Sequence, residues 1–95
     1  MDLTELDKDI LYKLGKKVNW SKKGHIPKEA IQSKFSVHQR GAVKKRIEEL
    51  VSKGLIYEKP HGGKSSYGLS KKGRKTSLKI KKEGDRNDYP DLEIE

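Results

Sequence analysis

Residues 36–69, SVHQRGAVKKRIEELVSKGLIYEKPHGGKSSYGL, decide the fold. Ser36 and Gln39 form the Ser-x-x-Gln pattern of a capping box, which marks the start of a helix. Apolar residues then recur at helical spacing: Val43, Ile47, Leu50 and Val51. Gly54 follows in the position where helices commonly end. We therefore predict a helix over roughly residues 37–53.

The second half of this stretch predicts a β-hairpin. Residues 55–59, LIYEK, and residues 65–69, SSYGL, form the two predicted strands. Residues 60–64, PHGGK, join them as a loop, in which the paired glycines permit the positive φ angles of a hairpin connection. A helix followed at once by such a hairpin is the first sign of the architecture.

Two further helices are predicted upstream. Thr4 and Asp7 form a capping-box pattern, and the apolar stripe behind them predicts a helix over residues 4–18. After a polar loop, the residue before Pro27 is held in an extended conformation, and a short helix over residues 27–34 follows. Only two to four residues separate this helix from the next, as a helix-turn-helix requires.

The order of these elements predicts a mainly α chain with a small β-hairpin (α+β). It is a winged helix-turn-helix with a three-helix core plus a wing. We predict one domain over residues 1–83 and an acidic, flexible tail over residues 84–95. The segment after Leu69 stays open: Ser70 suits a helix cap, whereas Gly73 and the alternation over residues 76–80 favour a strand.

Charge is concentrated in the middle of the chain. The net charge is +9, and 39% of residues are charged. Residues 21–83 carry eighteen bases and five acids, whereas residues 84–95 carry one base and five acids. A field of that sign attracts polyanions, so nucleic acid is the predicted partner. The alternative is a lysine-rich surface that only confers solubility.

Catalytic and metal chemistry lack support in the sequence. Cysteine is absent, and the three histidines are too far apart in sequence for metal-ligand spacing, so no metal or cofactor is expected. The run Gly63-Lys64-Ser65 resembles the end of a phosphate-binding loop, but Glu58 stands where that motif needs glycine. We predict a protein that is not an enzyme. No secretory signal or membrane span is apparent, which predicts a cytoplasmic, nucleoid-associated protein.

Three segments resemble a known family. Residues 46–56, RIEELVSKGLI, resemble the stretch that ends the recognition helix and enters the wing in many winged-helix regulators. Residues 67–74, YGLSKKGR, resemble the segment that closes the wing in MarR-like proteins, and residues 3–11 resemble their first winged-helix helix. The resemblance covers about residues 3–80 and implies a compact, archaeal-type DNA-binding regulator. MarR-like regulators carry additional long helices at both ends, which build the dimer and a ligand pocket, and we expect this chain to be too short for both.

Contacts to DNA are predicted on the helix over residues 37–53 and on the wing. His38 and Arg40 face outward toward base edges, Lys44 and Lys45 reach phosphates, and the small Ala42 permits close approach. The remaining predicted contacts are Gln39, nearer the core edge, Lys28 at the front of the preceding helix, and Lys59, His61 and Lys64 around the wing tip. The alternatives are a solvated basic helix face and an ordinary exposed hairpin.

The predicted function is sequence-specific or general binding of double-stranded DNA by a transcription regulator. One alternative is a winged-helix protein that binds structured RNA or the ribosome, since high lysine content suits both. A second alternative is a protein-interaction module. A homodimer is plausible because one such domain offers a small binding surface, and the helix over residues 4–18 and the segment after Leu69 are the predicted contacts.

Overall fold

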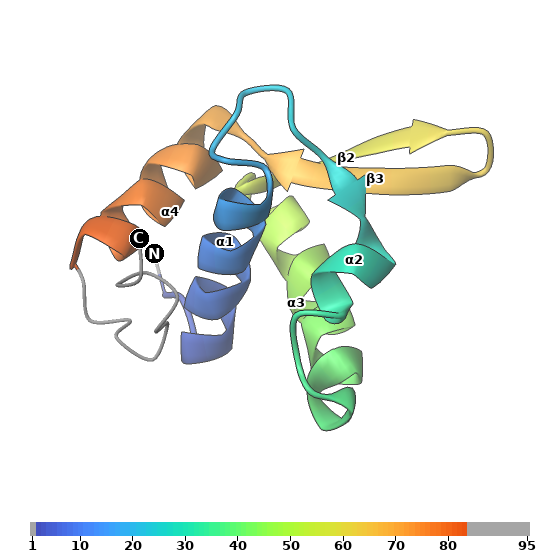
Figure 1. Cartoon of the computed structure of the whole chain (residues 1–95), viewed down its shortest axis with the longest axis horizontal. Helices are drawn as coiled ribbons and strands as arrows, with labels where there is room; N and C mark the ends of the chain where they lie inside the picture. Colours follow the sequence, from blue (N-terminus) through green and yellow to red (C-terminus); the bar gives the residue numbers. More distant parts are fainter. Residues whose placement is uncertain (1, 84–95) are drawn as a thin grey trace.

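The computed structural model describes residues 2–83, which form an α+β fold (Figure 1). The elements in chain order are α1 (Glu5–Lys17), β1 (Ile26–Pro27), α2 (Lys28–Gln32), the 3-10 turn η1 (Val37–Gln39), α3 (Arg40–Ser52), β2 (Ile56–His61), β3 (Lys64–Leu69) and α4 (Lys71–Glu83). This is the predicted winged helix-turn-helix order with one helix added after the wing. The predicted tail at residues 84–95 lies outside the described residues, so the domain boundary stays a prediction.

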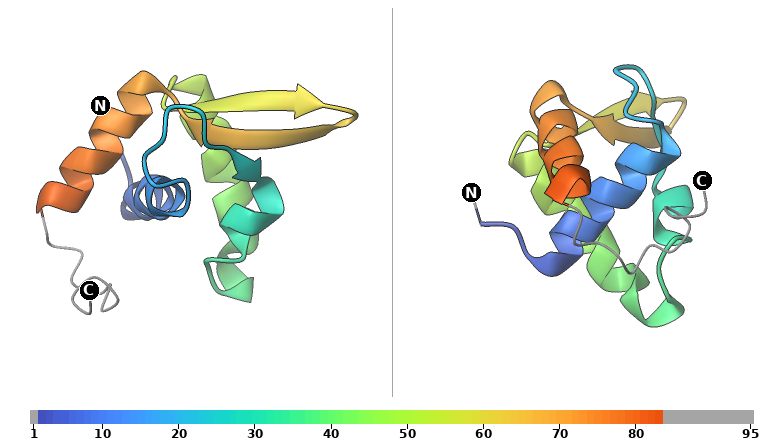
Figure 2. Two further views of the ribbon diagram at one scale, coloured as in Figure 1. Left: turned by 45° about the horizontal axis from the view of Figure 1, so that its top comes forward. Right: turned by 60° about the vertical axis from the view of Figure 1, so that its left-hand side comes forward.

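Helix α1 lies at the centre of the molecule, with α4 on one side and α2 and α3 on the other (Figure 2). The predicted capping box starts it: Thr4 Oγ1 accepts from the backbone N–H of Asp7, and Asp7 Oδ2 accepts from that of Thr4, both at 3.0 Å. Its apolar stripe joins a single buried cluster, formed by Ile10, Leu11, Tyr12, Leu14, Ile31, Phe35, Val43, Ile47, Leu50, Leu55, Ile56, Tyr67, Leu69 and Ile80.

Two predicted helix boundaries need correction. The helix expected over residues 27–34 is shorter, because Pro27 is extended (φ −63°, ψ 156°) and pairs in β1 before α2 begins. The helix expected over residues 37–53 begins as the 3-10 turn η1 and continues as α3. The predicted capping box at Ser36 is present, and Gln39 Oε1 accepts from the Ser36 backbone N–H at 3.3 Å.

The sheet is antiparallel with strand order β1-β3-β2. The β2–β3 register runs from Ile56 opposite Leu69 to His61 opposite Lys64. The predicted five-residue loop is therefore only two residues long, because residues 60, 61 and 64 belong to the strands. Gly62 (φ 55°) and Gly63 (φ 78°) both adopt left-handed conformations, as a tight two-residue hairpin turn requires.

The segment after the wing is helical, so the strand suggested for residues 76–80 is wrong. Ser70 caps α4, which is the helical alternative for this segment, because its hydroxyl accepts from the backbone N–H of Gly73 at 2.9 Å. Gly73 does not break the helix: it lies against the carbonyl of Leu55, where any Cβ would collide with backbone. Ser77 holds the middle of α4, donating to Leu11 O at 2.7 Å and accepting from Trp20 Nε1 at 2.9 Å.

Candidate nucleic-acid interface

The helix-turn-helix consists of α2, a connection over residues 33–36, and η1 with α3. Phe35 anchors the connection, because its side chain is buried in the core cluster. Gln32 Nε2 donates to the carbonyl of Arg40 at 2.9 Å and so ties the end of α2 to the start of α3. These contacts fix the orientation of α3 relative to α2, and with it which residues at the start of α3 are exposed.

The outward face of η1 and α3 is basic and small. Val43, Ile47 and Leu50 point into the core, as the apolar stripe predicted. Six predicted contact residues lie exposed along η1 and α3: His38, Gln39, Arg40, Ala42, Lys44 and Lys45. Within residues 2–83, no carboxylate forms an ion pair with Arg40, Lys44 or Lys45. The Gln39 side chain is already engaged with Ser36, so it is the least available of the six.

Arg46 is the one base of α3 that turns inward. Its guanidinium donates from Nε to Asp7 Oδ1 at 2.7 Å and from Nη2 to Oδ2 at 3.0 Å. Burial raises the pKa of Asp7, but hydrogen bonds from Arg46 and Thr4 outweigh it and hold that pKa below the ordinary value. This forked contact fastens α3 to the first turn of α1.

The wing projects away from the helices, and its tip carries the predicted basic residues (Figure 1). Lys59, His61 and Lys64 are all exposed, and they lie on the paired strands beside the glycine turn. His61 Nε2 lies 3.0 Å from Ser66 Oγ, so its ring folds back onto β3. The side chains of Lys59 and Lys64 are therefore freer to contact a ligand than the His61 ring is.

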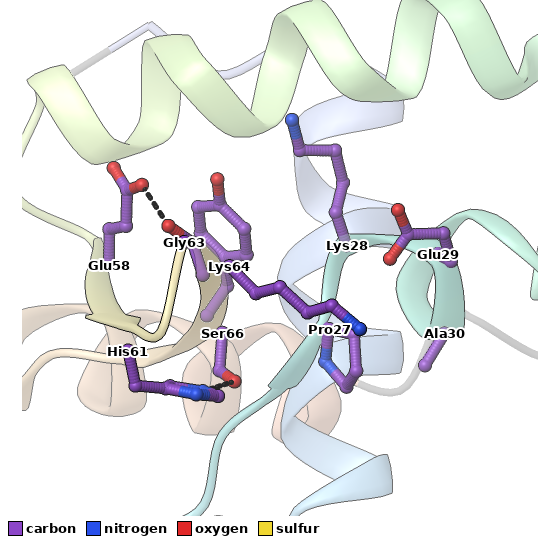
Figure 3. A pocket seen from close by; sticks show the side chains of 11 residues that line it. Pro27, Lys28, Glu29, Ala30, Glu58, His61, Gly63, Lys64 and Ser66 are labelled. Atoms are coloured by element: carbon purple, nitrogen blue, oxygen red, sulfur yellow. Dashed lines mark hydrogen bonds between the residues drawn. The ribbon is translucent and has the colours of Figure 1, made fainter.

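An open groove of about 680 Å³ separates the wing from the start of α2 (Figure 3). Lys64 reaches across it from the wing, and Lys28 points from α2 toward α3, with its Nζ 5.8 Å from the ring centre of Tyr67. Two carboxylates also line the groove, those of Glu29 and Glu58. The structure thus brings together Lys28 and Lys64, which the sequence predicted separately.

Tyr67 forms the wall between groove and core. Burial raises the pKa of its phenol, and the nearby carboxylates of Glu58 and Glu48 raise it further, so the hydroxyl stays neutral at neutral pH. The Glu58 carboxylate itself accepts a hydrogen bond from Ser65 Oγ at 2.6 Å, which partly compensates its negative charge. The wall therefore presents a neutral ring and hydroxyl beside the lysines.

Two features of this surface escaped prediction. Val37, 70% exposed, stands at the front of η1, where an apolar side chain suits contact with a thymine methyl group. The sequence does carry a signal for this exposure, because Val37 directly follows the cap residue Ser36 and lies outside the apolar stripe of Val43 and Ile47. His25 and His61 lie close together, with ring centres 6.5 Å apart, although their sequence separation had suggested otherwise. The described residues nevertheless contain no group of three side chains able to hold a metal.

Comparison with known proteins concerns the fold alone. The structure is similar to the crystal structure of RV1404 from Mycobacterium tuberculosis, with a TM-score of 0.70 at 20% sequence identity. The match covers 99% of this chain, which spans 61% of the length of that protein. No family model matches the sequence, and no curated protein matches it significantly. Within residues 2–83, every helix is too short or too polar to cross a membrane.

Proposed function

We propose that this protein binds double-stranded DNA, with η1 and α3 in the major groove and the wing on the backbone or in the minor groove. It acts by binding rather than catalysis, as a transcription regulator or general DNA-binding protein of the cytoplasm and nucleoid. The MarR-like segments and the order of the elements support this assignment.

The partition of cations on α3 carries the proposal. Arg46, on the inward side, is fixed to Asp7, whereas Arg40, Lys44 and Lys45, on the outward side, have no carboxylate partner in the described part of the chain. Charges left exposed and unpaired at the front of a helix-turn-helix are suited to phosphates and base edges.

The acidic residues of the same helix limit the contact to its front. Glu48 and Glu49 are exposed near the end of α3 and repel phosphate there. The wing follows these two glutamates in the chain and carries two exposed lysines, Lys59 and Lys64. A duplex that meets the front of α3 and the wing spans this acidic interval without close contact.

The first test is fluorescence anisotropy with a random-sequence DNA duplex and a matched structured RNA, titrated across salt. Arg40→Ala/Lys45→Ala should weaken DNA binding at least about tenfold, because two phosphate or base contacts are lost. The matched control is Lys17→Ala/Lys23→Ala, two exposed lysines outside α3 and the wing, with a change below about threefold.

Three results would contradict the proposed DNA-binding function or its interface. Equal binding by the α3 variant and the wild type contradicts the proposed interface. Tighter binding of the RNA at equal salt favours the RNA- or ribosome-associated alternative. Binding to neither nucleic acid at low salt leaves the protein-interaction module.

A homodimer remains part of the proposal, because two copies would double a small binding footprint. Helix α1, one of its two predicted contacts, is largely covered by the helices on either side of it. Sedimentation velocity at micromolar concentration decides the matter, since a dimer doubles the mass.

A further inference from the structure

The outward face of α4 is a line of lysines. Lys71, Lys75, Lys79 and Lys82 follow one another at intervals of four, four and three residues, so they share one side of the helix, and all four are exposed. The opposite side carries the buried residues Gly73, Ser77 and Ile80. We call these four lysines the α4 lysine face.

Within residues 2–83, the α4 lysine face has no ion-paired counter-charge. Helix α4 contains seven bases and a single acid, Glu83. Like charges four residues apart repel, and Lys71 at the first turn opposes the helix dipole. Both effects destabilise the helix, and only Lys82, in the last turn, is favoured by the dipole. Helix stability therefore does not account for the row as a whole.

The α4 lysine face points away from the proposed DNA interface. Ser77 hydrogen-bonds the carbonyl of Leu11, so the buried side of α4 faces α1. Helices α2 and α3 lie on the other side of α1 in Figure 1 and in the left view of Figure 2. A duplex held by α3 and the wing therefore lies on the far side of the molecule from these lysines.

The chemistry of the face suits a phosphate backbone. Lysine ammonium groups are compact charges without the forked geometry that reads a base, so they favour sequence-independent contact with phosphates. From Lys71 to Lys82 the helix rises about 16 Å, which is enough to follow several phosphates of one strand. Lys22 and Arg74 line a shallow hollow beside Lys71 and extend the positive surface.

We propose that the α4 lysine face binds the backbone of a second DNA duplex, so that one molecule bridges two segments. The bridge rests on the proposed function, because α3 and the wing hold the first duplex. Two copies of this chain do not dock through this face alone, since two lysine rows would then meet.

The test is a bridging assay with the full chain. A duplex fixed to beads and a labelled free duplex are mixed with protein, and retained label is measured. Lys71→Gln/Lys75→Gln/Lys79→Gln/Lys82→Gln should retain at least about tenfold less label than wild type, since four phosphate contacts are lost. Arginine at the same four positions keeps the charge and should bridge like wild type. Circular dichroism confirms that each variant is folded.

Anisotropy with a single duplex separates this inference from the proposed function. The glutamine variant should keep wild-type affinity for a single duplex, whereas Arg40→Ala/Lys45→Ala should bind it at least about tenfold more weakly, with only the contact through the α4 lysine face left intact. Equal bridging by the glutamine variant and the wild type overturns the inference, as does a wild type that binds one duplex and never two. Capture of polyglutamate in place of a second duplex also overturns it. If the α3 variant binds as wild type and only the glutamine variant fails, the α4 lysine face stands as a DNA surface and the proposed function falls.

Discussion

The wing lysines offer a quantitative test of the proposed interface. Six exposed or half-buried cations lie on it: Lys28, Arg40, Lys44, Lys45, Lys59 and Lys64. Replacing the two wing lysines by glutamine removes two charges without changing the glycine turn between the strands. The strands keep their register because their backbone pairing is untouched.

The expected magnitude follows from counterion release. If each of the six cations neutralises one phosphate, the logarithm of the binding constant falls with the logarithm of salt at a slope of about −5.4. Affinity then drops by about three decades between 50 and 200 mM salt. Lys59→Gln/Lys64→Gln should reduce the slope to about −3.6 and the drop to about two decades. The difference of about 1.8 does not depend on contacts elsewhere on the protein.

Fluorescence anisotropy at four or more salt concentrations measures both slopes. Lys17→Gln/Lys23→Gln carries the same charge change away from the interface and should keep the wild-type slope. A wing variant with weaker binding and an unchanged slope would refute the reasoning, because the lysines would then act by some route other than phosphate neutralisation. A slope lowered equally by the control would show that only total charge matters.

Three further predictions concern stability. Burial raises the pKa of Asp7 but its charged hydrogen bonds hold it below 3.8, so the carboxylate stabilises the fold above that pH. The advantage of wild type over Asp7→Asn in urea unfolding should therefore shrink as pH falls from about 5 to 2. Gly73→Ala should lower the unfolding free energy by about 1–3 kcal/mol, whereas Gly41→Ala, with open space around it, should raise it by about 0.5–1 kcal/mol. Ser77→Ala removes the hydrogen bonds to the buried Leu11 carbonyl and the half-buried Trp20 indole and should cost about 1–3 kcal/mol in the same assay, against about 0.5 kcal/mol for the half-buried Thr76→Ala.

The elements that could be predicted from the sequence are those with local signals. The capping boxes at Thr4 and Ser36 place helix starts, because the residues that form them lie within one turn. The paired glycines place the wing tip, because only a few residues adopt consecutive positive φ angles. The exposed face of α3 follows from the same reasoning, since Val43 and Ile47 fix which side is buried.

The elements that could not be predicted depend on contacts between distant segments. Gly73 lowers local helix propensity, and only its approach to the Leu55 carbonyl explains why glycine stands in a helix there. The fork between Arg46 and Asp7 joins residues 39 positions apart, and no local pattern pairs them. Likewise, the groove that unites Lys28 with Lys64 exists only because β1 pairs with β3.

The strand order has a consequence for how the protein behaves at high concentration. β2 is an outer strand of the sheet, and a protruding hairpin with a free edge is a template for pairing with strands of other molecules. Pro60 lies in that strand and has no N–H to offer, and Lys59 beside it adds a charge that a stacked copy would repel. The same short segment that contacts the duplex in the proposed complex therefore also protects the molecule from edge-to-edge aggregation.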